Sequence, residues 1–204
     1  MIKDKLHLGC GPHSIKEGWL NVDLRPFPGI DEALDATKPW PHVDRFKFIY
    51  AEHFLEHLSL DGALSFFENA NKAMKINGVL RITTPSLEWV LKTHYTFPSD
   101  SRQIQEQTLT INRAFHGWGH QFLWSKDFLV RALEAHGFAD IQFFEYGKSN
   151  YKELMDVENH GNYTRREGFP SVWILEAIAK HTQVDASFRN WCEQSFLRHV
   201  RSGH

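Results

Sequence analysis

The segment that most constrains the fold lies near the amino end, where two glycines one residue apart follow an apolar run. Residues 6–8 lead into Gly9 and Gly11, and a second apolar run at residues 19–22 leads into Asp23. This order predicts a strand that ends in a tight turn, beside a strand that carries an acid at its tip. Glycine allows the turn and a close approach of the backbone to a ligand. The carboxylate can accept hydrogen bonds from a ribose diol, so the segment indicates a site for an adenosine-containing cofactor, with an ordinary strand-end turn as the alternative.

The turn departs from the dinucleotide fingerprint G-x-G-x-x-G, in which an acid follows about 20 residues on. Ser14 stands at the third glycine position, Pro12 offers no N–H, and Asp23 follows Gly9 by only 14 residues. A pyrophosphate requires several backbone donors at a helix N-terminus, and this segment leaves little room for such a helix. S-adenosylmethionine carries no phosphate, so these residues favour S-adenosylmethionine over NAD.

The composition argues against several classes of protein. The 23 basic and 25 acidic residues give a net charge of −2, and the cations form no stripe, so we expect neither nucleic acid nor a membrane as a partner. No apolar run approaches the roughly 18–20 residues of a membrane span, and the first residues lack the apolar core of a signal peptide. The two cysteines, Cys10 and Cys192, cannot build a disulfide framework, and they favour a reducing compartment and hence a cytoplasmic location. The sequence carries no indication of the oligomeric state.

Short apolar runs alternate with helical patterns, which predicts a Rossmann-like α/β sandwich formed by a single domain over residues 1–204. The expected strands cover residues 5–9, 19–24, 32–36, 46–51, 79–84, 141–146 and 172–178. One helix is expected at residues 60–75 and is ended by an αL turn at Asn77 and Gly78. A second helix is expected to begin after an N-cap at Ser125, and a third, amphipathic helix is expected at about 184–200. Residues at about 94–121 are less regular, and a long irregular stretch in a compact domain is usually functional.

The fourth expected strand runs into the sequence AEHFLEHL, which contains the zinc-binding motif H-x-x-E-H. On a helix, His53 and His57 would lie one turn apart and could share a zinc ion, with Glu56 beside them. Such hydrolases need the motif inside a long helix and a third, distant ligand, whereas here a strand leads directly into it. We therefore expect no stoichiometric metal, and we keep a zinc hydrolase as an alternative from a different class. For His57 the simpler interpretation is a histidine that bonds nearby backbone.

Five segments in this order resemble the class I S-adenosylmethionine-dependent methyltransferases: LHLGCGP, LNVDL, LDAT, FIYAEHFLEHL and NGVLRITTPS. The resemblance covers about residues 5–92 and continues more weakly to the last expected strand. It implies a three-layer sandwich whose seven-stranded, mostly parallel sheet has the order 3-2-1-4-5-7-6, with the last strand antiparallel. It also implies S-adenosyl-L-methionine as the cofactor and S-adenosyl-L-homocysteine as the product formed from it.

The resemblance further implies which residues contact the cofactor. Gly9 and Gly11 match the glycines beside the methionine part, and Asp23 matches the ribose-binding acid. Asp35 matches the acid that contacts adenine, for which a turn aspartate is the alternative. The full set of expected contacts is Leu8, Gly9, Cys10, Gly11, Asp23, Leu24, Asp35, Ala36, Ala51, Glu52, His53 and His57. Pro12 and the missing first helix depart from the family pattern and leave one side of the cofactor more open.

Methyl transfer depends on aligning the acceptor with an activated cofactor, and an acceptor that carries a proton must lose it. Histidine is the usual base near neutral pH, and the candidates are His120, His116 and His53, each with a packed or surface histidine as the alternative. The stretch at about 94–121 is expected to act as a lid over the acceptor. The N/D-P-P-Y/F signature of base-modifying enzymes is absent, so a small-molecule or sugar-type acceptor is expected. A non-catalytic S-adenosylmethionine-binding protein is the alternative.

Overall fold

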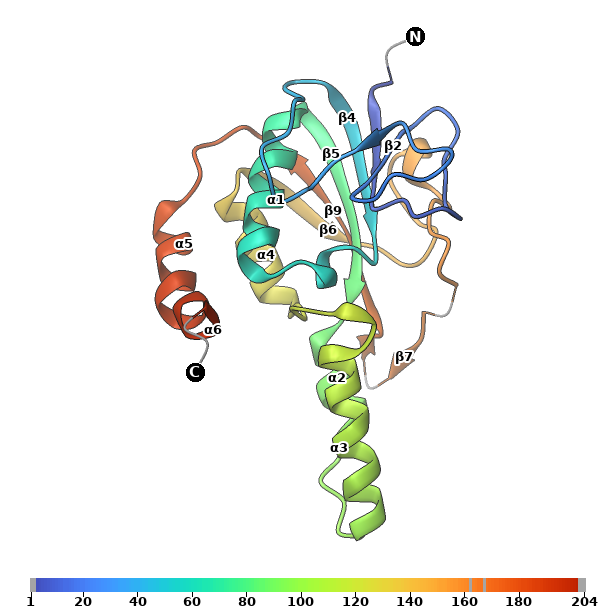
Figure 1. The fold of residues 1–204 in the computed structure, drawn as a ribbon, viewed down its shortest axis with the longest axis vertical. Coiled ribbons are helices and arrows are strands. Elements are labelled where there is room, and N and C mark those ends of the chain that lie inside the picture. The colour runs from blue at the N-terminus through green and yellow to red at the C-terminus, as the bar shows by residue number, and fades with distance from the viewer. Residues whose placement is uncertain (1–2, 162, 167, 202–204) are drawn as a thin grey trace.

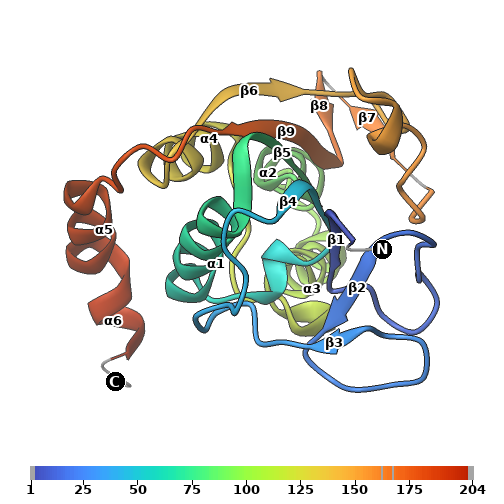
Figure 2. The same cartoon turned by 90° about the horizontal axis from the view of Figure 1, so that it is seen from above.

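A seven-stranded sheet with the order β3-β2-β1-β4-β5-β9-β6 forms the centre of the computed structural model, which describes residues 3–161, 163–166 and 168–201 (Figures 1 and 2). Neighbouring strands among the first five are parallel, and β9 is antiparallel to both of its neighbours. The predicted strand order is confirmed, with β9 in the place of the seventh expected strand. The strand bounds are β1 (Lys5–Leu8), β2 (Leu20–Asp23), β3 (Glu32–Ala33), β4 (Phe46–Glu52), β5 (Met74–Pro85), β6 (Phe138–Phe143) and β9 (Val172–Ala179).

Helices cover one face of the sheet, and largely irregular segments cover the other. Figure 2 shows α1 (Leu60–Ala73) and α4 (Lys126–Ala135) on the helical side, where the larger apolar core lies. The opposite face holds a smaller core that includes Trp19, Tyr50 and Leu154. In the described part of the chain no helix connects β1 to β2, so the layer over this face is built from loops.

The helices α2 (Leu87–Thr93) and α3 (Ser101–His116) project from the carboxyl edge of the sheet, as Figure 1 shows. The expectation that the stretch at about 94–121 is irregular was wrong for its greater part, because α3 alone spans 16 residues. Ala114 is the one buried residue of α3, and this helix packs against Val90 of α2 along a narrow apolar stripe. Such a thin stripe leaves little apolar periodicity in the sequence.

Several element boundaries differ from the prediction for local reasons. The first predicted helix, α1, ends at Ala73 rather than at residue 75, because Met74 already pairs with Phe46 in the sheet. The expected αL residue is Asn77, with a φ of 61°, and it lies within β5 rather than at the helix end. The sixth expected strand begins at Phe138 rather than at residue 141, because the chain enters the strand directly after α4.

The expected C-terminal helix at about 184–200 is confirmed as three consecutive segments: α5 (Ala186–Cys192), the π-helical η4 (Glu193–Leu197) and α6 (Arg198–Arg201). A small hairpin of β7 (Arg165–Arg166) and β8 (Phe169–Pro170) lies outside the main sheet and was not predicted. None of the helices in the described residues is both long enough and apolar enough to cross a membrane.

Candidate functional site

The turn after β1 has the backbone conformation that its glycines predict. Gly9 and Gly11 have φ values of 65° and 56°, in the left-handed region that favours glycine. A Cβ atom on Gly9 would lie 2.6 Å from the Cδ2 atom of Phe54, so this position also requires the absence of a side chain. Leu8 and Cys10 are buried, and burial raises the pKa of the Cys10 thiol to about 11. Leu8 therefore has only its backbone to offer a cofactor, whereas Cys10 lines the cavity beside the turn.

Two carboxylates lie near the same edge of the sheet as the turn. Asp23, at the tip of β2, is half-buried and accepts hydrogen bonds from the Gly11 N–H at 3.0 Å and from the Arg25 N–H at 3.2 Å. Asp35, after β3, accepts bonds from the hydroxyl and the N–H of Thr37, which lower the pKa of its carboxyl group. Each carboxylate oxygen has two lone pairs, so both acids keep capacity for a ligand. The adjacent residues differ in exposure, since Leu24 is exposed and Ala36 is buried.

Two cavities meet at the carboxyl edge of the sheet. The smaller, of about 310 Å³, is lined by the glycine turn together with His7 and Glu52. The larger, of about 450 Å³, lies under α2 and α3 and is lined by Trp89, Arg113 and other residues. Three histidines line both cavities and so mark their junction: His53, His57 and His160. Asp23, Leu24, Asp35 and Ala36 lie outside the smaller cavity, near the ends of β2 and β3, and Ala51 is buried within β4.

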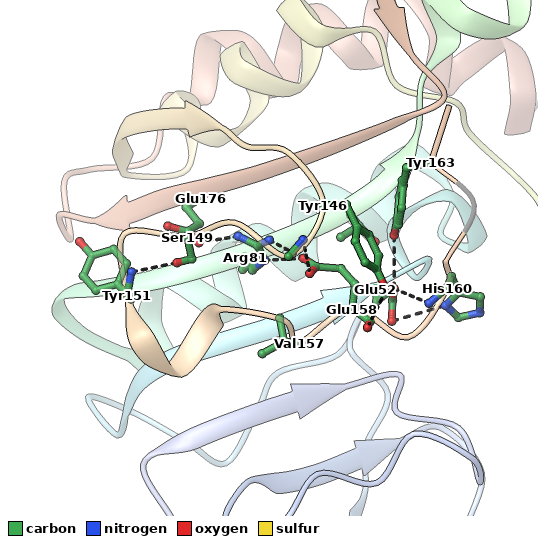
Figure 3. A network of polar contacts seen from close by, with 12 residues as sticks. Glu52, Arg81, Tyr146, Ser149, Tyr151, Val157, Glu158, His160, Tyr163 and Glu176 are labelled. Carbon is green, nitrogen blue, oxygen red and sulfur yellow. Dashed lines mark hydrogen bonds and ion pairs between the residues drawn. The ribbon is translucent and has the colours of Figure 1, made fainter. Parts of the chain in front are cut away.

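Glu52, at the end of β4, holds a crossing segment that we call the strap (residues 144–161). Its carboxylate accepts bonds from the N–H groups of Asn159 and His160 and from the Tyr163 hydroxyl. Figure 3 shows Glu52 beside His160 and Tyr163. Burial raises the pKa of the Glu52 carboxyl, but the two backbone bonds outweigh burial, and the net result is a lowered pKa. Glu52 therefore fixes the strap against the smaller cavity, a role that the sequence did not indicate.

His53 has the setting of a proton acceptor between the two cavities. Its φ of 45° turns the chain out of β4, and its N–H bonds to the Thr83 carbonyl. Its Nδ1 atom lies 2.9 Å from the Oε1 atom of Glu56, which is fully buried and also accepts a bond from the Thr84 hydroxyl. Burial lowers the pKa of His53, but the bond to Glu56 and the nearby carboxylate charges outweigh burial and raise it.

The H-x-x-E-H segment does not lie on one helix. His53 precedes the short 3₁₀ helix η1 (Leu55–His57), and the two imidazole rings do not share a helical face. The His57 ring instead packs edge-on against that of His120, with ring centroids 5.2 Å apart. His120 follows the short 3₁₀ helix η2 (Gly117–Gly119) and lines the larger cavity. His116, at the end of α3, is exposed and lines neither cavity.

The structure adds cavity residues that the sequence analysis did not name as site residues. The larger cavity is also lined by Val90, His94, Arg113, Ala114, His160 and Ser171. They come from α2, α3, the strap and the segment before β9, which are distant in the sequence. Sequence spacing could not bring these elements together, because α3 itself was not predicted.

No protein-family model and no curated protein matches the chain, but solved structures match its fold. The YcgJ protein of Bacillus subtilis has a TM-score of 0.52 at 14% identity, over 87% of this chain and 92% of that one. A SAM-dependent methyltransferase of Archaeoglobus fulgidus has a TM-score of 0.51 at 17% identity, over 85% of each chain. A Bordetella parapertussis protein described as a possible exported protein has a TM-score of 0.51 at 14% identity, and this chain covers 62% of that protein's length.

At these identities the likeness concerns the fold. The chain has the class I S-adenosylmethionine-dependent methyltransferase fold, as the sequence resemblance implied. In such open α/β sheets, ligands bind outside the carboxyl ends of the strands, where the strand order reverses. That is the edge at which the glycine turn and the two cavities lie.

Proposed function

We propose that this chain is an S-adenosylmethionine-dependent methyltransferase that acts on a small-molecule or sugar-type acceptor. The observation that carries the proposal is the junction of the two cavities at His53, His57 and His160. A cofactor behind the glycine turn and an acceptor under α2 and α3 would meet there. A methyl group can pass only between atoms that are close and aligned, so a shared wall is the arrangement that the reaction requires.

The residues present fit S-adenosylmethionine better than a dinucleotide. Residues 11–13 continue the glycine turn without starting a helix, so the helix N-terminus that a pyrophosphate requires is absent from this described segment. Asp23 would hold the ribose hydroxyls, Asp35 the adenine amino group, and the backbone of Gly9 and Gly11 the methionine part. When bound, the cofactor supplies a methyl group already activated by the positive charge on sulfur.

The chain itself would orient the acceptor, exclude water and accept a proton. With Nδ1–H of His53 donating to Glu56, the Nε2 atom keeps a free lone pair that can take a proton from the acceptor. The Glu56 carboxylate would stabilise the resulting imidazolium. Trp89 and Trp118 line the larger cavity beside Arg113 and His120, and they would enclose an acceptor with both apolar and polar parts. His53 therefore stays the candidate base and His120 a candidate for contacting the acceptor, whereas the exposed position of His116 does not favour an acid–base role for it.

A cytoplasmic setting and the absence of nucleic-acid partners belong to the same proposal. Cys10 and Cys192 are both free and buried, which suits a reducing compartment. The net charge of −2 provides no attraction for a polyanion.

Calorimetry with S-adenosylhomocysteine and NAD tests the cofactor. We expect the former to bind and NAD to bind at least tenfold more weakly. Asp23→Ala should weaken S-adenosylhomocysteine binding by about 1.5–3 kcal/mol, because a charge-assisted bond to the ribose is lost. Asp127→Ala, on the exposed side of α4, is the control and should leave binding unchanged. Tighter binding of NAD would overturn the proposal.

Catalysis is tested separately from binding. S-adenosylmethionine is incubated with acceptors that carry hydroxyl, amine or thiol groups, and formation of S-adenosylhomocysteine is measured. Turnover above the acceptor-free rate, lowered in His53→Gln, supports the enzyme. Binding without turnover on any acceptor class would favour the non-catalytic alternative.

A further inference from the structure

Three potential metal ligands converge on the wall of the larger cavity. Glu56, His57 and His120 each offer one ligand atom, and these atoms lie within 4.8 Å of one another. Glu56 is fully buried and the two histidines are half-buried, and all three line the cavity. Two imidazoles and one carboxylate form a donor set that zinc and other first-row divalent ions use at catalytic sites. We infer that these three residues bind a divalent transition-metal ion in the acceptor cavity.

The hydrogen bonds around His120 and Glu56 prepare these two side chains for this role. The Nδ1 atom of His120 lies 2.9 Å from the Ala114 carbonyl oxygen, to which it can only donate. Its Nε2 atom is then unprotonated and available as a ligand. The two oxygens of Glu56 are held by His53 and by the Thr84 hydroxyl, and each oxygen retains a second lone pair. Metal ligands are commonly oriented by such outer partners.

Backbone bonds hold the two distant parts of the site together. The N–H groups of Gln121 and Phe122 donate to the Glu56 carbonyl oxygen at 2.7 and 3.3 Å. The Gln121 side chain donates to the His57 carbonyl oxygen at 2.6 Å. The segment that carries His120 is therefore fixed against η1, and these bonds bring the three ligands together.

This metal site differs from the one that the H-x-x-E-H motif suggests. His120 takes the place of His53, which serves instead as a hydrogen-bond partner of Glu56. The inference is an alternative to the expectation that this segment binds no metal, and the metal titration below decides between the two. Three protein ligands would leave open positions on the ion, and all three residues line the acceptor cavity, so an acceptor bound there could reach the ion.

The open positions indicate the chemical class of the acceptor, a step that rests on the proposed function. An ion at this place would coordinate an oxygen of the acceptor and lower the pKa of a coordinated hydroxyl group. We therefore assign the acceptor to compounds that present a hydroxyl group, with a neighbouring oxygen able to complete the coordination. Imidazole ligands suit zinc, cobalt and related ions, whereas magnesium prefers sites made of oxygen ligands.

The test uses the untagged full chain, stripped of metal with a chelator and titrated with Co²⁺ by calorimetry and visible absorption. We expect one equivalent of Co²⁺ to bind, with the absorption of a nitrogen- and oxygen-ligated ion. Mg²⁺ should bind at least 100-fold more weakly. His120→Ala should weaken Co²⁺ binding at least tenfold, whereas His116→Ala, four residues away and outside the cavity, should not. Binding that is absent, or equally strong in His120→Ala, would overturn the site.

Two further measurements separate this inference from the proposed function. Glu56→Gln should also weaken Co²⁺ binding. Glu56 is fully buried, however, so the variant at the half-buried His120 decides if the Glu56 variant does not fold. S-adenosylhomocysteine binding should be the same within threefold in His120→Ala and in the chelated protein, because His120 does not line the smaller cavity. Metal binding in a chain that fails to bind S-adenosylhomocysteine would support the metal site and overturn the methyltransferase.

Discussion

The two glycines of the turn after β1 lie in different surroundings, although both have positive φ. A Cβ atom on Gly9 would collide with the Phe54 ring, whereas one on Gly11 would meet no atom within 4 Å. Phe54 lies between β4 and η1, so its ring joins the glycine turn to the segment that carries the histidines of the junction. The need for glycine at position 9 is therefore a matter of packing as well as backbone conformation, and sequence spacing indicated only the latter.

This difference predicts unequal costs for the same substitution. Gly11→Ala should lower the free energy of unfolding by about 1–2 kcal/mol, the cost of a left-handed alanine. Gly9→Ala should cost at least about 1 kcal/mol more, because the Phe54 ring must shift. Chemical denaturation of the two variants and of Gly9→Ala combined with Phe54→Ala measures the packing part. Equal costs for the two single variants would show that Phe54 plays no part.

At the scale of elements, the strands were predicted well and the protruding helix was not. Most strands of the sheet, though not β3, carry apolar residues between polar turns, a pattern that depends on neighbours close in sequence. The helix α3 contacts α2 through a few residues only, and most of its residues are exposed. The meeting of His57 with His120 depends on where α3 and η2 end, so it could not be predicted from spacing. The glycine turn and its acid could be predicted from spacing, because they adjoin consecutive strands.

The shallow packing of α3 predicts that it opens more readily than the other helices. α1 has nine buried residues among 14, whereas α3 has one among 16. Tertiary packing, rather than length, provides most of a helix's stability in a protein, so backbone amides of α3 should exchange with solvent at least about 100-fold faster than those of α1. Hydrogen-exchange mass spectrometry on peptides covering residues 60–73 and 101–116 measures this. The shorter helix α4, with four buried residues among ten, is the control and should resemble α1. Equal protection of α3 and α1 would contradict the prediction.

At the scale of the whole molecule, a buried ion network ties the strap to the centre of the sheet. Arg81 of β5 is fully buried; its Nε atom donates to Glu158 of the strap at 2.7 Å and its Nη1 atom to Glu176 of β9 at 2.6 Å (Figure 3). Glu158 adjoins Asn159 and His160, whose N–H groups bond to Glu52, so the two networks act on one stretch of chain. This network could not be predicted from the sequence, because Glu158 and Glu176 lie 77 and 95 residues from Arg81. It positions His160 at the junction of the cavities.

Removing the cation from this network should therefore affect both stability and the site. Arg81→Met leaves Glu158 and Glu176 buried without their partner, and it should lower the free energy of unfolding by about 3–5 kcal/mol. Combining it with Glu158→Gln and Glu176→Gln should recover at least half of that loss, because neutral amides cost less to bury than unpaired charges. Arg102→Met breaks the exposed pair with Glu106 and is the control, with an expected change below about 1 kcal/mol. Denaturant unfolding measures the stability of all three variants.

Binding of S-adenosylhomocysteine should weaken in Arg81→Met but not in Arg102→Met, since only Arg81→Met releases the strap that carries His160. A loss in Arg81→Met no larger than in Arg102→Met would mean that the network does not hold the strap.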